Sequence, residues 1–143
     1  MKDIENSKKE SPFLGLTGMG GGVASLMWAA GGFGIWSWGR SDHGALGLNQ
    51  GGNPGPSVSS PTQIGTETNW TTPIIVGSYV GSFQSALKND GTLWTWGQNY
   101  IGALGLNEGE PGAKSSPVQV GTDTTWAGGC MGKSEQYMVK TDG

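Results

Sequence analysis

The stretch Leu93-Trp94-Thr95-Trp96-Gly97 decides the fold, because it repeats a pattern that occurs earlier in the chain. The first copy is Ile35-Trp36-Ser37-Trp38-Gly39, so that Trp36 corresponds to Trp94, 58 residues further on. At the same spacing, Gly44-Ala45-Leu46-Gly47-Leu48-Asn49 returns as Gly102-Ala103-Leu104-Gly105-Leu106-Asn107. Six consecutive identities indicate a structural repeat, and repeats of this length are typical of propellers and other arrays.

Two further blocks follow each copy at slightly shorter spacings. Residues 59–66 return as residues 115–122, and the block Lys88-Asn89-Asp90-Gly91 returns as Lys140-Thr141-Asp142-Gly143. The changes in length fall between blocks, where loops tolerate them, and we expect loops over residues 50–57 and 108–114. The repeats then extend from about residue 23 to residue 143, after a unique N-terminal segment of residues 1–22.

Within one repeat, short strands joined by turns are expected. Residues 82–87 and 92–96 flank Asp90-Gly91, and this dipeptide is typical of a type I′ hairpin turn. Because side chains alternate along a strand, Trp94 and Trp96 share one face, while Leu93 and Thr95 share the other. Gly97 ends that strand or allows close approach of another backbone. Residues 102–106 predict a turn leading into a short buried edge, and residues 117–120 predict another strand.

The composition agrees with a turn-rich, all-β protein. The chain has 28 Gly in 143 residues but no Gly-X-Y period, and its seven Trp argue against disorder. The net charge is −3 and the basic residues are scattered, so we expect no nucleic-acid partner. Residues 13–39 carry no charge, but Gly interrupts them repeatedly, so we expect neither a membrane span nor a signal peptide.

The repeated motifs resemble those of a known family. Residues 91–99 followed by Gly102-Ala103-Leu104-Gly105, and the matching stretch around Trp36 and Trp38, resemble the RCC1 repeat (regulator of chromosome condensation). The resemblance covers residues 23–143, is closest to bacterial and phage versions, and implies blades of a β-propeller. It implies roles that range from nucleotide exchange to enzyme inhibition and surface display, so the fold does not fix the function.

Two repeats are too few to close a propeller, which typically has 4–8 blades. An isolated pair of blades leaves open strand edges, which favour aggregation. We therefore expect either that the chain is a fragment of a longer protein or that several copies complete one another's sheets in an oligomer.

Residues able to carry out chemistry are few. His43 is the only histidine, and the corresponding residue of the second repeat is Ile101, so a loop role is expected rather than catalysis. Cys130 is expected to be a small buried apolar residue, and Glu108 and Glu110 to lie in a solvated loop. We expect no catalytic residue, no cofactor and no metal site, and hence no enzyme. The Trp residues are expected to pack between blades, which leaves the variable loops for recognition.

These observations lead to a hypothesis about function. Residues 1–22 are polar and then Gly-rich, and they loosely resemble the N-termini of marine phage appendage proteins. We expect a virion structural protein of the tail or fibre type, anchored to other virion proteins through residues 1–30 and displaying its repeats for host recognition. The ligand would be a host surface protein or a glycan. The alternative is a bacterial protein-binding propeller, secreted or cytoplasmic, that acts as a scaffold or inhibitor.

Overall fold

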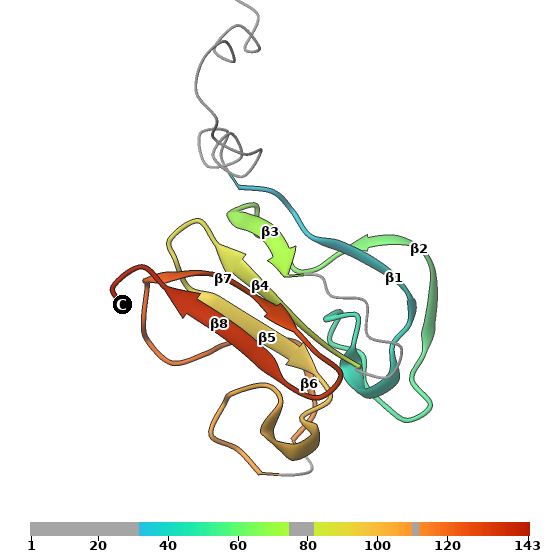
Figure 1. Cartoon of the computed structure of the whole chain (residues 1–143). Coiled ribbons are helices and arrows are strands. Elements are labelled where there is room, and N and C mark those ends of the chain that lie inside the picture. The colour runs from blue at the N-terminus through green and yellow to red at the C-terminus, as the bar shows by residue number, and fades with distance from the viewer. Residues whose placement is uncertain (1–31, 75–81, 110–111) are drawn as a thin grey trace, which may run out of the picture.

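The structure is a computed structural model that describes residues 32–74, 82–109 and 112–143. These residues form eight β-strands and two short 3-10 turns, with no α-helix among them, which confirms the all-β class (Figure 1). The 3-10 turns are Asp42–Gly44 and Tyr100–Gly102. The strands are β1 Trp36–Arg40, β2 Ser57–Gln63, β3 Trp70–Ile74, β4 Phe83–Lys88, β5 Leu93–Gly97, β6 Lys114–Gln119, β7 Trp126–Met131 and β8 Gln136–Lys140.

The strands form three antiparallel sheets that follow one another along the chain. A four-stranded sheet of order β3-β4-β5-β6 is the complete blade. The pair β1-β2 precedes it and the pair β7-β8 follows it. By the sequence repeat, β1-β2 corresponds to β5-β6, and β7-β8 corresponds to β3-β4. The chain therefore supplies a first half-blade, a complete blade and a last half-blade, consistent with part of an RCC1-like propeller.

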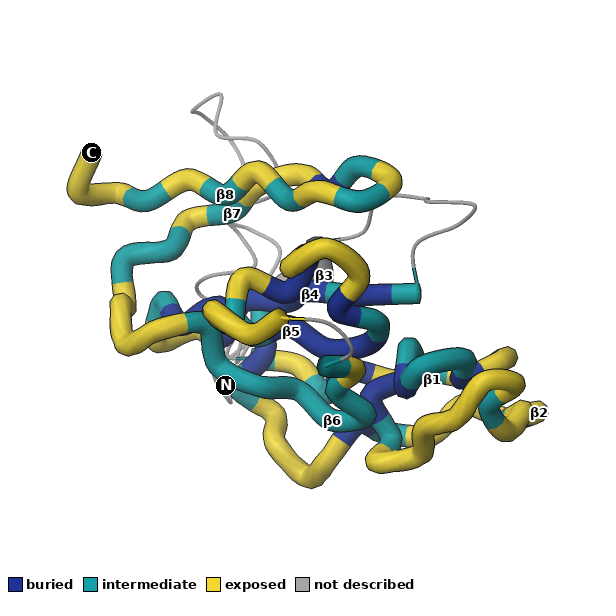
Figure 2. The backbone as a smooth tube through the Cα atoms, turned by 90° about the horizontal axis from the view of Figure 1, so that it is seen from below, coloured by how far each residue is buried: buried dark blue, intermediate teal, exposed yellow. Residues whose placement is uncertain are grey.

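The complete blade buries both of its faces, as the alternation of β5 predicted. Trp94 and Trp96 pack toward the first half-blade with Trp70 and Ala86, while Leu93 packs toward the last half-blade. Figure 2 shows the consequence, since the buried residues concentrate in β4 and β5 and the half-blades are mostly intermediate or exposed. Two apolar clusters, one on each side of the blade, thus hold the half-blades against it.

Proline limits further pairing at both edges of the complete blade. Pro73 lies in β3 and Pro117 in β6, the two outer strands of the sheet. Proline lacks the N–H that a ladder needs and is tolerated at sheet edges. Pro61 occupies the corresponding place in β2.

The hairpin between β4 and β5 forms where expected, but the predicted type I′ turn is wrong. Asp90 does not have a positive φ, and Gly91 alone adopts one, at 79°. Gly91 N donates to Lys88 O at 3.0 Å and Lys88 N donates to Thr92 O at 3.0 Å, which closes a three-residue loop. Asp90 Oδ1 accepts from both Thr92 N and Thr92 Oγ1, and this local bonding stabilises a turn in which Asp90 lacks the positive φ of type I′.

The Gly-rich segment after β5 is a turn, as predicted, but no strand follows directly. Thr95 Oγ1 donates to Leu104 O at 3.0 Å, and Asn99 Nδ2 donates to Glu108 O at 3.1 Å. The first repeat makes the same bonds with shorter side chains, from Ser37 and Ser41 to the carbonyls of Leu46 and Gln50. Equivalent hydroxyl and amide groups therefore fix the path of both turns.

Two burial predictions fail at the flanks of the described structure. Trp36 and Trp38 are 54% and 60% exposed, although their counterparts Trp94 and Trp96 pack between blades. Cys130 is exposed rather than buried, because it pairs across the sheet with Tyr137 on the uncovered face of the last half-blade. In each case the residue lies on a face that no described element covers.

The predicted boundary between residues 1–22 and 23–143 lies outside the described residues, as do the proposed anchor of residues 1–30 and Glu110. Among the residues that the structure describes, no helix is long and apolar enough to cross a membrane.

Candidate functional site

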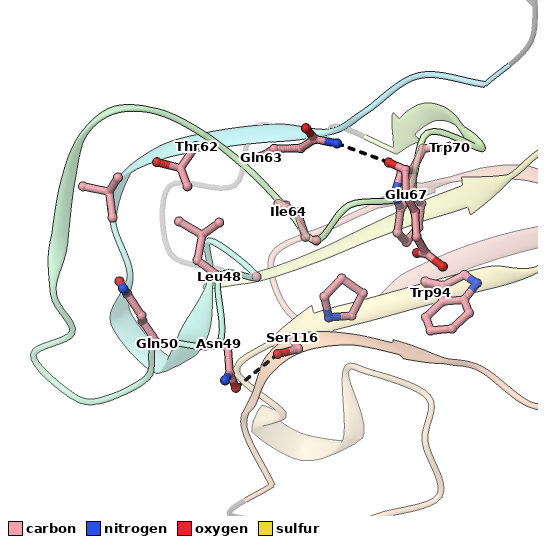
Figure 3. Close-up of a pocket in the computed structure, with 14 residues that line it drawn as sticks. Leu48, Asn49, Gln50, Thr62, Gln63, Ile64, Glu67, Trp70, Trp94 and Ser116 are labelled. Atoms are coloured by element: carbon pink, nitrogen blue, oxygen red, sulfur yellow. Dashed lines mark hydrogen bonds between the residues drawn. The ribbon is translucent and has the colours of Figure 1, made fainter.

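The candidate site is a cleft between the first half-blade and the complete blade, with a volume of about 520 Å³. Figure 3 shows that its walls come from the turn after β1, from the end of β2 and the segment leading to β3, and from β5 and β6. It is lined by Gly47, Leu48, Asn49, Gln50, Val58, Thr62, Gln63, Ile64, Gly65, Glu67, Trp70, Trp94, Ser116 and Pro117. The cleft borders the apolar cluster between the two sheets, since both include Leu48, Ile64, Trp70 and Trp94.

The floor of the cleft is aromatic. Trp70 is fully buried and meets Trp94 edge-on, with ring centroids 6.0 Å apart and planes at 78°. Trp70 meets Trp96 in a similar way, at 6.4 Å and 66°. Edge-to-face pairs of this kind stabilise a core beyond the area that they bury. The indole of Trp94 is only half buried and so contributes an apolar surface to the cleft.

A buried lysine is held against this aromatic floor. Lys88 Nζ lies 3.7 Å from the centroid of Trp94 and 4.8 Å from that of Trp70, and its side chain is 5% exposed. Glu67 at the rim completes the arrangement, with Oε2 at 2.8 Å from Lys88 Nζ. A buried ammonium needs such partners, because burying an unpaired charge is costly.

The same arrangement recurs one repeat later. Lys140 pairs with Asp123, and its Nζ lies 4.7 Å from the centroid of Trp126. The pair raises the pKa of Lys140, chiefly through the hydrogen bond to Asp123. The motif of lysine, indole and carboxylate is therefore part of the repeat rather than a catalytic device. The sequence analysis missed it, although an acid at residue 67 and again at residue 123 keeps the spacing of the repeat.

The rim of the cleft is polar and uncharged apart from Glu67. Asn49 N donates to Ser115 O at 2.7 Å, and Ser116 Oγ donates to Asn49 Oδ1 at 3.4 Å, so this residue ties the first turn to the complete blade. Gln63 Nε2 donates to Glu67 O at 3.4 Å. Amide and hydroxyl groups around an apolar floor suit recognition by hydrogen bonding, and such a composition is typical of binding sites.

The loop between β1 and β2 is fixed by Asp42. Its Oδ1 accepts from Gly55 N at 2.8 Å, and its Oδ2 lies 2.7 Å from Arg40 Nε. The backbone hydrogen bond from Gly55, with help from Arg40, holds the pKa of Asp42 below its usual value. Residues 41–56 therefore form an anchored loop at the edge of the cleft.

The residues singled out from the sequence do not gather into a reactive centre. His43 lies in the 3-10 turn with φ of 53°, and Ile101 holds the matching place with φ of 50°. Cys130 lies on the last half-blade, and Glu108 pairs with Lys114 at 2.7 Å in its loop. No group of three or more potential metal ligands occurs in the described part of the chain. The cleft offers hydrogen bonds and an indole surface, which support binding.

This chain is similar to a known repeat family and to part of a human protein. The family model of the Regulator of chromosome condensation (RCC1) repeat matches residues 90–128. A human protein described as "Probable E3 ubiquitin-protein ligase HERC6" is 33% identical over 88 residues, which make up 61% of this chain and 8% of that protein. The chain therefore spans only a small part of the length of this relative.

Proposed function

We propose that this chain, which belongs to the RCC1-like repeat family, serves as a non-catalytic protein-binding element that contacts its partner through the cleft and the adjoining loops. One observation carries the proposal. The bonds that fix each turn are the same in both repeats, from Ser37 and Thr95 to the carbonyls of Leu46 and Leu104, whereas the loops that these turns support differ in sequence. A constant scaffold with variable loops is the usual arrangement of a recognition surface.

The chemistry of the cleft supports binding rather than turnover. Repeats of this family are generally non-catalytic, and the amide and hydroxyl groups at the rim can pair with the backbone of a partner. The half-buried indole of Trp94 adds the kind of aromatic anchor that dominates many interfaces. The ligase activity named for the human relative is not carried over to this chain, because the match covers 8% of that protein.

A pair of bulky substitutions tests the role of the cleft. Ser116→Trp places an indole at the rim, whereas Thr124→Trp places the same side chain at an exposed position before β7, outside the cleft lining. A partner recovered with the unmodified chain is then titrated against each variant. We expect Ser116→Trp to weaken binding at least tenfold and Thr124→Trp to leave it unchanged. Equal binding by both variants would place the partner elsewhere.

The finer proposal is that the chain is a virion structural or appendage protein. Its support is the polar and Gly-rich N-terminal sequence, whose composition is suited to ordering on another protein. Quantitative mass spectrometry of purified particles tests this proposal, and we expect the chain at a fixed ratio to the other structural proteins. If the chain is found only in cells, in a stoichiometric complex with one host protein, the alternative of a bacterial scaffold or inhibitor holds instead.

A further inference from the structure

Corresponding glycines of the two repeats have different surroundings. A Cβ on Gly44 would lie 2.5 Å from Ser115 Cα, so the complete blade fills the space beside it. The same atom on Gly102 would meet no described atom within 4 Å. Both residues have similar φ values, 81° and 78°, so the backbone of the turn is the same and only the neighbour differs.

A second pair of glycines shows the same difference. A Cβ on Gly47 would lie 2.9 Å from Trp96 Nε1, whereas the nearest atom to one on Gly105 is Val120 Cγ1 at 3.7 Å. The indole that packs on the first turn therefore has no described counterpart on the second turn. A cavity of about 530 Å³ lies there instead, bounded by Leu93, Val120 and Trp126 among others. Beside the first turn, Ser115 and Trp96 occupy the corresponding spaces. The sequence repeat aligns Ser115 with Ser59 and Trp96 with Trp38.

The first half-blade has a comparable open space beside Gly39 in β1. A Cβ on Gly97 would lie 2.6 Å from Phe83 Cα, where β4 and the residue before it run alongside β5. Around Gly39, the counterpart of Gly97, no described atom lies within 4 Å of such a Cβ. The residues that correspond to Ser82 and Phe83 are Ser134 and Glu135, immediately before β8.

Exposed apolar side chains gather on the same two strands. Trp36 and Trp38 lie on β1, and Tyr137 and Val139, which are 65% and 59% exposed, lie on β8. Among the described strands, β1 pairs only with β2 and β8 only with β7, so neither has a described partner on its other edge. Unpaired edges with large apolar side chains are sites where another strand adds.

We propose that β8 of one copy of this chain pairs with β1 of a second copy, so that the last half-blade of the first copy and the first half-blade of the second form one composite four-stranded blade. The order β7-β8-β1-β2 would reproduce β3-β4-β5-β6. In the register of β4 and β5, where Ser85 lies opposite Thr95, Tyr137 lies opposite Ser37 of the second copy. Trp38 of the second copy then enters the space beside Gly105.

The lysine motif is consistent with this composite blade. Lys88 lies against two indoles and is almost fully buried, whereas Lys140 lies against Trp126 alone and its side chain is 31% exposed. The second indole of the complete blade is Trp94, and its counterpart is Trp36. Pairing of β8 with β1 of a second copy would supply that indole and complete the motif.

A second copy is the occupant because the two ends of the described structure are complementary halves of a single blade. The new interface would continue the one that the chain already forms twice between its own sheets. Such contact is head-to-tail, so each copy offers a further free end and the assembly grows until it closes into a ring. Each copy contributes the equivalent of two blades, and rings of 4–8 blades are the usual size of propellers.

Disulfide trapping tests the register directly. In a Cys130→Ser background, the double variant Ser37→Cys/Tyr137→Cys places two thiols at directly opposed positions of the composite blade. We expect oxidation to give covalent multimers on denaturing gels. Ser60→Cys/Tyr137→Cys, with one thiol on the exposed part of β2, is the control and is expected to remain monomeric. A disulfide within one chain, or equal trapping by the control, would overturn the proposal.

Two glycine substitutions separate assembly from folding. Gly102→Ala adds a Cβ that would collide with Ser59 of the second copy, just as a Cβ on Gly44 would collide with Ser115. We expect this variant to weaken association by about tenfold or more in sedimentation experiments. Gly121→Ala is the control, because Gly121 also has a positive φ of 62° and neither it nor its counterpart Gly65 would meet any described atom within 4 Å. A monomeric mass for the unmodified chain at all concentrations would overturn the proposal. Residues 23–30, which the repeat aligns with the β4 region, or further blades of a longer polypeptide would then be the partners of these edges. That outcome would not affect the binding test of the cleft with Ser116→Trp.

Discussion

Replacing Glu67 by Gln tests whether the buried lysine of the complete blade depends on its carboxylate. The Glu67→Gln variant keeps the shape of the side chain but leaves the Lys88 ammonium, 5% exposed and 3.7 Å from the Trp94 centroid, without a counter-charge. Removing one partner of a fully buried ion pair costs about 3–5 kcal/mol. Glu67 is 52% exposed, so solvent screens the pair, and we expect a loss of about 1–2 kcal/mol.

The measurement is urea unfolding followed by Trp fluorescence, with Glu67→Gln compared with three variants. Asp123→Asn removes the corresponding carboxylate beside the more exposed Lys140 and is expected to leave the midpoint unchanged. Lys88→Met in the Glu67→Gln background removes the uncompensated charge while keeping an apolar stem, and we expect it to recover most of the loss. The single Lys88→Met variant completes the cycle. The reasoning fails if Glu67→Gln unfolds at the midpoint of the unmodified chain, or if Asp123→Asn costs as much.

Three further predictions concern the turns and the core. Leu104→Ala removes a fully buried side chain and is expected to lower the free energy of unfolding by about 2–5 kcal/mol, and a loss well below 1 kcal/mol would show that the residue is not in the core. Gly44→Ala and Gly102→Ala share the strain of a positive φ, about 1–2 kcal/mol, but within one copy only the Cβ of Gly44→Ala meets Ser115. In dilute solution, where the composite blade does not form, we expect Gly44→Ala to unfold at the lower urea concentration, and the reverse order would contradict the packing. The hydrogen bonds from Thr92 lower the pKa of Asp90 below its unfolded value. The ionised Asp90 therefore stabilises the folded chain fully above the unfolded pKa near 3.8, and this contribution is lost as the pH falls through the folded pKa. Asp90→Asn is therefore expected to flatten the acid side of the stability profile, and an unchanged profile would contradict this assignment.

The repeat made most of the blade predictable from the sequence. The alternation of Trp94 and Trp96 with Leu93 and Thr95 follows from the two-residue period of a strand, and the structure places the two pairs on opposite faces. The turn type at Asp90-Gly91 was not predictable in the same way, because the hydrogen bonds of Asp90 with Thr92 compete with the conformation that the dipeptide favours.

Burial at the flanks could not be inferred by analogy between repeats. Trp36 and Trp94 occupy the same place in their repeats, but only Trp94 has a described sheet beside it. The cleft could not be predicted from the sequence either, because Asn49, Glu67 and Ser116 come from different blocks and line one cleft only when the sheets pack. The Glu67–Lys88 pair did leave a signal, since Asp123 and Lys140 recur in the same roles.

Amide hydrogen exchange along the chain tests most directly whether one complete blade lies between two half-blades. In dilute solution, we predict the slowest exchange for the central strands β4 and β5, which have a hydrogen-bonded strand on each side. Amides on the open edges of β1 and β8 are predicted to exchange quickly there and to become protected as the concentration of the chain rises. Uniform protection of all eight strands in dilute monomer, or fast exchange in β4 and β5, would contradict the arrangement of one blade and two halves.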